Sequence, residues 1–182
     1  MKKSMLQFTT IISLTILLCF AFSCQKRAEK AELEEMNAKA EIEAQNKAII
    51  LRLLEEMDKQ NFGILDELFA DDIKCYASGS FEPLDKETTK QLIAMFYGSF
   101  PDYTHTIEDV IAKDDKVVIR CIYRGTHKGD FMDIPATGKT IEYSGSSIWQ
   151  LRDGKIKEVW VVEDMLTFMQ QLGMELKPKE EK

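Results

Sequence analysis

Residues 140–162 read TIEYSGSSIWQLRDGKIKEVWVV, and this stretch decides the fold. The dipeptide Asp153-Gly154 has turn chemistry, because glycine adopts a positive φ without a Cβ clash and aspartate tolerates one better than most residues. β-Branched and aromatic residues flank the dipeptide on both sides, with no proline among them. The stretch therefore predicts an antiparallel hairpin, with strands over 140–151 and 156–162, at the centre of a curved sheet.

The length of the hairpin loop determines which side chains share a face. If Asp153-Gly154 alone forms the loop, Ser147 falls opposite Trp160. If Arg152 joins the loop, Ser147 falls opposite Val159. The three-residue loop is favoured, since aspartate suits the second turn position and only the glycine then needs a positive φ. Because a shift of one residue exchanges the two faces of a strand, both registers remain open.

Helices are expected before the sheet. Apolar residues at helical spacing predict helices over 49–57 and 64–70, and a third from Asp85 or Lys86 to Phe100, where Pro101 ends it. Further strands are predicted over 74–76, 104–112 and 116–124, and a last helix runs from Met165 to a stop at Gly173. Helices followed by strands are typical of the α+β class.

Six motifs follow one another in a fixed order along the second half of the chain. They are FPDY (Phe100–Tyr103), VVIRCIYRGTHKGDF (Val117–Phe131), IPATGK (Ile134–Lys139), YSG (Tyr143–Gly145), RDGKI (Arg152–Ile156) and W-x-x-x-D (Trp160–Asp164), closing in QQLG. In this order, from about Ile49 onwards, the chain resembles the SnoaL-like polyketide cyclases, which include many predicted ester cyclases. The resemblance implies the nuclear transport factor 2 fold, in which a cone-shaped antiparallel sheet wraps around about three N-terminal helices and encloses an apolar pocket.

The N-terminus is typical of a targeting segment. Lys2 and Lys3 precede an apolar run from Leu6 to Phe22, and small residues lie close to Cys24. This pattern resembles the lipobox of bacterial lipoproteins, whose cysteine is acylated and becomes the mature N-terminus. A membrane-spanning anchor is less favoured, because the run is no longer than the roughly 17 residues needed and is broken by hydroxyl residues. We expect a signal peptide over 1–23 and a domain in the bacterial cell envelope (periplasm), outside the cytoplasm, anchored to a membrane by lipid on Cys24.

Residues 24–47 are rich in Ala, Glu, Lys, Asn and Gln and predict a charged helical tether. A short dimerising coiled coil is the weaker alternative, since three clear heptads are absent. The folded domain is expected over 48–174, and residues 175–182 are expected to form a disordered tail.

Composition excludes several classes of function. The net charge is −7 and the basic residues form no stripe, which disfavours nucleic acid as a partner. The only histidines, His105 and His127, have no metal-site spacing, and no phosphate loop or dinucleotide fingerprint is present, so neither metal nor cofactor is expected. Outside the signal segment and Cys24, Cys75 and Cys121 remain, and buried reduced thiols are favoured over a disulfide.

The side chains that could carry chemistry lie on or near the last strands: His127, Tyr143, Ser147, Trp149, Glu158, Trp160, Glu163 and Asp164. The resemblance implies a carboxylate acid/base on the last strand, and Asp164 is taken for that catalytic role, with His127 as a second proton carrier. Two structural alternatives stay open: Asp164 caps the helix that follows, and His127 fixes the bend between Gly125 and Gly129.

Five further residues are expected to contact a ligand: Tyr143, Ser147, Trp149, Trp160 and Arg120. A structural ion pair is the alternative for Arg120. The expected function is cofactor-free acid/base cyclisation, isomerisation or hydrolysis of a small apolar or aromatic carbonyl compound. The alternatives are an envelope lipoprotein that binds a small hydrophobic ligand without catalysis, and a module that binds a partner, or forms a homodimer, through the open face of its sheet.

Overall fold

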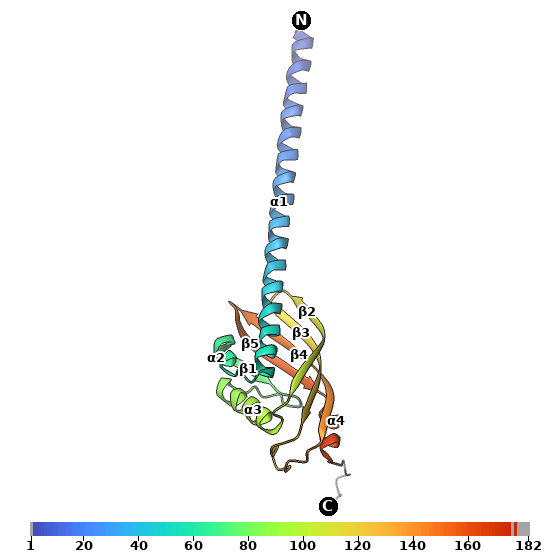
Figure 1. Cartoon of the computed structure of the whole chain (residues 1–182). Coiled ribbons are helices and arrows are strands. Elements are labelled where there is room, and N and C mark those ends of the chain that lie inside the picture. The colour runs from blue at the N-terminus through green and yellow to red at the C-terminus, as the bar shows by residue number, and fades with distance from the viewer. Residues whose placement is uncertain (1, 176, 178–182) are drawn as a thin grey trace, which may run out of the picture. The chain divides into compact units, whose positions relative to one another are not determined.

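The computed structural model describes residues 2–175 and 177, and of residues 2–24 and 28 it describes the backbone alone. The chain consists of two compact units, the first over residues 1–41 and the second over residues 42–182. One helix, α1 (Lys2–Asp58), runs through the first unit and the start of the second. Its bounds include both the predicted tether and the first predicted domain helix, so no break separates these two segments (Figure 1).

Two predictions fall wholly or partly outside the described residues. The side chain of Cys24 is among those not described, so its lipidation stays a prediction, as does most of the tail over 175–182. Within the described part of the chain, no helix is both long enough and apolar enough to cross a membrane.

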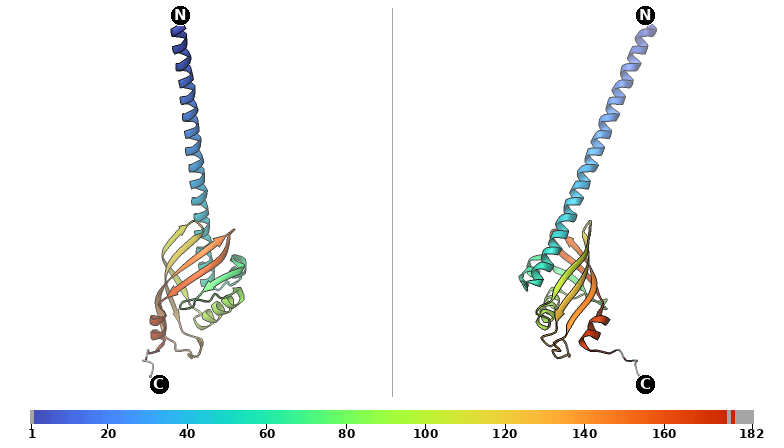
Figure 2. Two further views of the ribbon diagram at one scale, coloured as in Figure 1. Left: turned by 180° about the vertical axis from the view of Figure 1, so that it is seen from behind. Right: turned by 45° about the vertical axis from the view of Figure 1, so that its right-hand side comes forward.

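The second unit has the predicted α+β fold. After α1 come α2 (Gly63–Leu68), β1 (Phe69–Tyr76), α3 (Lys86–Ser99), β2 (Thr104–Lys113), β3 (Lys116–Thr126), β4 (Thr140–Arg152), β5 (Lys155–Glu163) and α4 (Met165–Leu172). The strands form one sheet in the order β1-β5-β4-β3-β2, antiparallel except for the parallel pair β1 and β5. Figure 2 shows this sheet curving around α2, α3 and the last part of α1.

The first strand is longer than the sequence predicts. The predicted helix over 64–70 ends at Leu68, and β1 begins at Phe69 rather than at Lys74. The added strand residues lie beside β5, with Phe69 opposite Ile156. The partner strand β5 is parallel and lies 80 to 90 residues away in the chain, so no hairpin turn marks β1 in the local sequence. The prediction from local spacing therefore placed the end of the helix too late.

The predicted hairpin is present, but the favoured three-residue loop is wrong. Arg152 pairs with Lys155, and the loop consists of Asp153 at φ 53° and Gly154 at φ 72°. Both residues therefore take the left-handed conformation that a two-residue hairpin loop with this twist requires. The three-residue loop was favoured because only Gly154 would then need a positive φ. In the structure Asp153 also adopts a positive φ.

A β-bulge in β5 then changes the register. Leu151 faces Ile156 but Gln150 faces Glu158, so Lys157 is an extra residue. Beyond it Ser147 pairs with Val161, and not with either predicted partner. The loop is one residue shorter than expected, and the bulge in β5 contains one extra residue. Beyond the bulge, each residue of β5 therefore points to the face that the three-residue register predicts. Consequently β5 points alternate side chains inwards from Val159 to Glu163, while Val162 is 70 % exposed.

The core lies between the concave face of the sheet and the helices. β3 and β4 bury every second residue, as strands with one covered face do. Phe100, Ile119, Ile156 and Phe168 are almost wholly inaccessible to solvent. Burial of each such side chain contributes about 1.5–3 kcal/mol to folding. Cys75 and Cys121 are free, buried thiols, which confirms the preference for reduced cysteines.

Candidate functional site

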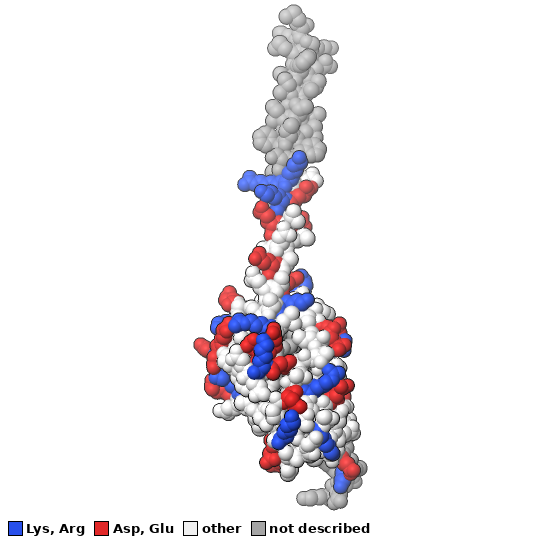
Figure 3. All heavy atoms as spheres, in the orientation of Figure 1, with Lys and Arg blue, Asp and Glu red and all other residues white. Residues whose placement is uncertain are grey.

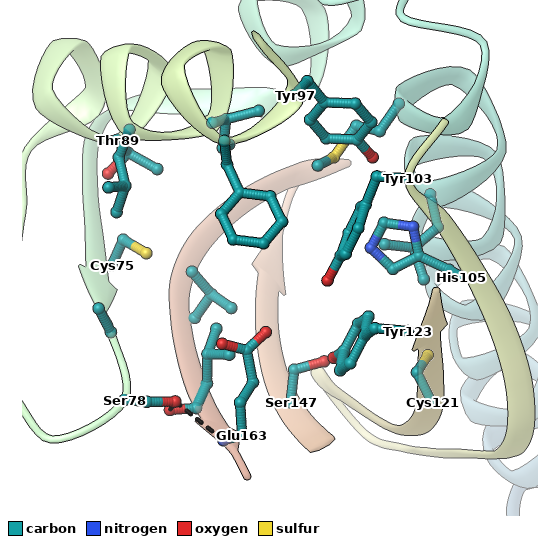
Figure 4. A pocket seen from close by; sticks show the side chains of 18 of the residues that line it. Cys75, Ser78, Thr89, Tyr97, Tyr103, His105, Cys121, Tyr123, Ser147 and Glu163 are labelled. Atoms are coloured by element: carbon teal, nitrogen blue, oxygen red, sulfur yellow. Dashed lines mark hydrogen bonds between the residues drawn. The ribbon is translucent and has the colours of Figure 1, made fainter. Parts of the chain in front are cut away.

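A cavity of about 190 Å³ lies within this core (Figure 4). Its walls come from α1, α3 and the concave face of all five strands, and they are mainly aliphatic and aromatic. The lining residues are Leu54, Met57, Phe69, Cys75, Ala77, Ser78, Thr89, Leu92, Ile93, Phe96, Tyr97, Tyr103, His105, Cys121, Tyr123, Ser147, Trp149, Val159, Val161 and Glu163. Apolar walls with a few polar groups are typical of small-molecule sites.

Glu163 supplies the carboxyl group of the cavity. It is the last residue of β5, and its backbone N–H donates a hydrogen bond of 2.8 Å to Ser78 Oγ, which fixes the strand end. Its side chain follows Val159 and Val161 on the concave face. Burial among apolar side chains raises the pKa of the Glu163 carboxyl to about 7, because the charged form loses hydration without gaining a cation. The group therefore exchanges protons near neutral pH.

Phenol groups stand beside this carboxyl. Tyr103 and Tyr123 stack with their ring centroids 5.8 Å apart, and both line the cavity. The Tyr103 hydroxyl is 2.8 Å from that of Tyr143, which lies behind the wall. Burial raises the pKa of all three phenols above the ordinary value for tyrosine. For Tyr123 and Tyr143 the second largest cause is the nearby negative charge of Glu163. All three phenols thus stay protonated and can donate hydrogen bonds.

A histidine and an aspartate meet at another part of the wall. His105, on β2, places Nδ1 2.5 Å from Asp58 Oδ1, and its backbone N–H donates to Asp58 Oδ2 at 3.1 Å. Asp58 is the last residue of α1, and Tyr97 Oη is 3.5 Å from its Oδ1. The His105 side chain is 8 % exposed and lines the cavity. One carboxylate therefore holds both the backbone and the ring of this histidine.

Two predicted ligand residues do line the cavity. Ser147 and Trp149 are neighbours on the concave face of β4, and the Trp149 indole N–H donates to Ser147 Oγ over 2.7 Å. Tyr143 faces the same side but touches the cavity only through its hydrogen bond to Tyr103.

The other two lie on the opposite face of the sheet. Trp160 stacks on Tyr76 with the rings 5.6 Å apart and nearly parallel. Arg120 is 48 % exposed and forms an ion pair with Asp109 over 2.7 Å, the structural alternative given above. Both side chains point away from the cavity because they occupy the alternate positions of their strands.

Asp164 does not line the cavity. It is the N-cap of α4, and its carboxylate accepts hydrogen bonds from Thr167 N at 3.0 Å and Thr167 Oγ1 at 2.7 Å. These bonds lower the pKa of the Asp164 carboxyl, so the group is ionised near neutral pH. The capping alternative describes this residue, and the carboxyl group that lines the cavity belongs to its neighbour Glu163.

His127 is also remote from the cavity lining. It is fully buried against Phe100, with ring centroids 5.0 Å apart, and its Nδ1 accepts from Thr137 N at 3.2 Å. Its backbone bonds Gly138 and Lys139, which ties the two ends of the β3–β4 connection together. The bend-fixing alternative describes this histidine.

The cavity thiols are poor nucleophiles. Burial raises the pKa of Cys121 to about 11 and also raises that of Cys75, so both are thiols at neutral pH. Among the lining residues none carries a basic amine or guanidinium, so an anionic ligand would meet no counter-charge. The described residues contain no cluster of three or more metal-ligating side chains. On the molecular face drawn in Figure 3, acidic and basic side chains of the second unit are interspersed.

Sequence reasoning weighed Glu163 but preferred Asp164, and it missed the pair of His105 and Asp58. The alternation of Val159, Val161 and Glu163 was the signal for the first, and the favoured three-residue register, which gives β5 the same faces, would have placed Glu163 inside. The pair has no comparable signal, because 47 residues separate its members and only the fold brings them together.

Comparisons with known proteins agree with this architecture. The profile of the family described as SnoaL-like polyketide cyclase matches residues 48–172. No curated protein sequence matches the chain. Among solved structures, IdmH from Streptomyces antibioticus, a proposed polyketide cyclase, is 31% identical, with a TM-score of 0.64 over 71% of this chain and 99% of its own.

Two more distant structures share the fold. A proposed SnoaL-like polyketide cyclase from Jannaschia sp. CCS1 is 22% identical, with a TM-score of 0.69 over 74% of this chain and 96% of its own. AclR from Streptomyces galilaeus, a proposed hydroxylase, is 24% identical, with a TM-score of 0.67 over 75% of this chain and 86% of its own. By the profile match and the likeness to IdmH, the chain belongs to the SnoaL-like polyketide cyclase family of the nuclear transport factor 2-like superfamily.

Proposed function

We propose that this protein is a cofactor-independent acid/base enzyme that acts on a small uncharged carbonyl compound, with Glu163 as the group that moves the proton. The observation that carries this proposal is a carboxyl group with a pKa of about 7 inside an apolar cavity. A general base works best when its pKa lies close to the working pH, because its basic form is then both populated and strong enough.

The first step is removal of a proton from the carbon next to the substrate carbonyl. The Glu163 carboxylate takes the proton, and the electron pair of the broken C–H bond becomes the carbon–carbon double bond of an enolate. Negative charge develops on the carbonyl oxygen, where a protonated phenol can donate a hydrogen bond, and Figure 4 shows the Tyr103 hydroxyl and the Glu163 carboxyl pointing into the same space. Such donors stabilise the transition state most strongly in a water-poor site.

The second step decides the product. In a cyclisation, the enolate carbon attacks a second carbonyl of the same molecule, and the new alkoxide takes the proton from Glu163. In an isomerisation the substrate is a β,γ-unsaturated carbonyl compound, so loss of the α-proton gives a conjugated dienolate, and Glu163 returns the proton to its γ-carbon while the double bond moves to the α,β position. Both routes leave the carboxylate as it began and need no redox partner.

The cavity accommodates a substrate portion of about one ring. An apolar cavity of about 150 Å³ binds benzene, so about 190 Å³ accommodates a slightly larger molecule. The absence of basic side chains from the lining disfavours carboxylates and phosphates as substrates.

Exchange of α-hydrogens tests the function without knowledge of the natural substrate. Acetophenone is incubated with protein in D₂O, and loss of the methyl proton signal is followed by NMR. We expect the wild type to accelerate exchange over buffer, and Glu163→Gln to lose about 10²–10⁴-fold of that acceleration. Asp164→Asn is the matched control: it changes the neighbouring carboxylate, which lies outside the cavity lining, and should exchange at the wild-type rate.

Equal exchange by wild type and Glu163→Gln would refute the proposed role of the carboxyl. Acetophenone binding without acceleration by the wild type would favour the non-catalytic ligand-binding alternative. Loss of exchange in Asp164→Asn alone would return the role to Asp164.

A further inference from the structure

Besides Glu163 and several hydroxyl groups, the cavity is lined by an imidazole ring, that of His105. His105 faces it from β2, whereas Glu163 faces it from β5, and β3 and β4 lie between these strands. Three strand spacings correspond to about 14 Å along the curved sheet. The pairing register sets both on the concave face, since the row of Glu163, Gly145, Cys121 and Ile107 lies next to the row of Tyr143, Tyr123 and His105. The two groups therefore meet a ligand at separate points.

Asp58 determines what His105 can offer. A carboxylate accepts hydrogen bonds, so the ring nitrogen 2.5 Å from it, Nδ1, must carry the hydrogen. In the neutral imidazole the remaining nitrogen, Nε2, is then an acceptor only. Among the described residues, no side chain or backbone group forms a hydrogen bond with Nε2 of His105. This atom is also not completely enclosed by protein atoms. The acceptor is thus available to a molecule in the cavity, which the His105 ring lines (Figure 4).

Several contacts hold His105 in a fixed position beside Asp58. Asp58 also accepts the backbone N–H of His105, so two bonds fix the ring against the end of α1. The rings of Tyr103 and Tyr123 contact the imidazole edge to face, at 5.3 and 5.4 Å between centroids. Aromatic walls and an anchored ring nitrogen leave little freedom for the imidazole to turn, which is how binding groups are preorganised.

We infer that His105 is a specificity-determining residue that accepts a hydrogen bond from the substrate through Nε2, that Asp58 is its positioning residue, and that the substrate is a one-ring-sized hydroxy-carbonyl compound. The hydroxyl lies towards β2 and the carbon that loses its proton lies towards β5. This inference rests on the proposed function for the identity of the reacting end, while the recognition of the hydroxyl stands on the pair of His105 and Asp58.

The first test is the tautomer of His105. The protein contains two histidines, so ¹⁵N-labelled histidine gives two ring systems, with His127 as the internal reference. At a pH where titration shows both rings to be neutral, long-range ¹H–¹⁵N spectra should show hydrogen on Nδ1 of His105. Asp58→Asn should shift that population towards the other tautomer and leave His127 unchanged. Hydrogen on Nε2 of His105 in the wild type would overturn the inference.

The second test is discrimination between two probes of nearly equal shape, 4-hydroxyacetophenone and 4-methylacetophenone. The wild type should bind the hydroxyl compound about tenfold more tightly by calorimetry, the value of one hydrogen bond to a buried acceptor. His105→Phe should abolish the preference, and His105→Gln, whose side-chain oxygen can accept at a similar position, should restore part of it. Equal affinities in the wild type would overturn the inference.

The two tests separate the failure of this inference from failure of the proposed function. Absence of α-hydrogen exchange by the wild type bears on Glu163, because the tautomer and the affinity ratio are measured without any turnover. Exchange without a preference for the hydroxyl probe would retain the proposed function and remove the role of His105.

Discussion

Gly145 lies directly opposite Glu163 in the pairing of β4 with β5, and it has no side chain because Glu163 occupies that space. A Cβ at Gly145 would lie 2.9 Å from Cγ of Glu163 and 2.8 Å from Cε2 of Tyr123. Both distances are shorter than real Cβ contacts. The glycine therefore allows the carboxyl group and a phenol ring from two different strands to approach over the same point of the sheet.

Gly145→Ala should displace Glu163, Tyr123 or both, and we expect α-hydrogen exchange to fall at least tenfold, because small misplacements in a site cost rate heavily. Gly98→Ala is the matched control, since a Cβ there meets nothing within 4 Å and alanine favours helix α3 by up to about 1 kcal/mol. Unchanged exchange in Gly145→Ala would mean that the carboxyl position is not critical.

The Glu163 carboxyl should make stability depend on pH. Its pKa is about 7 in the folded protein against an ordinary value of 4.5, so the folded state binds more protons between these two values. Stability is then greatest below the lower value and falls as the pH rises to the upper one, by at most about 3 kcal/mol. Urea unfolding at pH 5 and pH 8 should show Glu163→Gln gaining on the wild type at the higher pH. A constant difference would contradict the raised pKa.

The Asp164 cap predicts a stability effect without a catalytic one. Asp164→Ala removes the acceptor for Thr167 N and should lower the free energy of unfolding by about 1 kcal/mol. Asparagine caps almost as well as aspartate, so Asp164→Asn should lose much less in the same thermal or urea measurement. Similar losses in both variants would assign the effect to charge rather than to the cap.

The hydroxyl pair of Tyr103 and Tyr143 should behave as one unit. Tyr143→Phe leaves the buried Tyr103 hydroxyl without its partner and should cost about 1–3 kcal/mol of unfolding free energy. Adding Tyr103→Phe should cost little more, since both polar groups are then gone. Additive losses in the double variant would show that the two hydroxyls stabilise the fold independently.

Lipidation of Cys24 is tested by partition between detergent and water. In a bacterial host the full chain should enter the detergent phase and carry the mass of acyl groups, because two or more chains hold a protein stably on a membrane. Cys24→Ala should remain in the aqueous phase. A wild-type protein of unmodified mass in the aqueous phase would show that the cysteine is not an anchor.

The fold was predictable because local patterns and tertiary structure agree over most of the chain. Alternation marks β3 and β4, Asp85 and Gly173 mark the ends of α3 and α4, and Asp153-Gly154 marks the hairpin. The site was only partly predictable, because it depends on a one-residue choice of register. Ser147 and Trp149 share one face of β4 in either register. The favoured three-residue register also gives β5 the observed faces and would place Glu163 inside, but the resemblance directed the choice of acid to Asp164.

The bulge at Lys157 also bears on how such a strand can change in length during evolution. Ile156 and Val159 are both fully buried although they are three positions apart, which in a regular strand would place them on opposite faces. Loss of Lys157 would regularise β5 and keep Val159 and Glu163 inside, because the residues after it keep their partners on β4. Loss of one residue after Val159 would instead turn Glu163 outwards. The effect of a one-residue deletion in β5 therefore depends on its position relative to Val159. Deletion of Lys157 leaves the Glu163 carboxyl in the cavity, whereas a deletion after Val159 removes it.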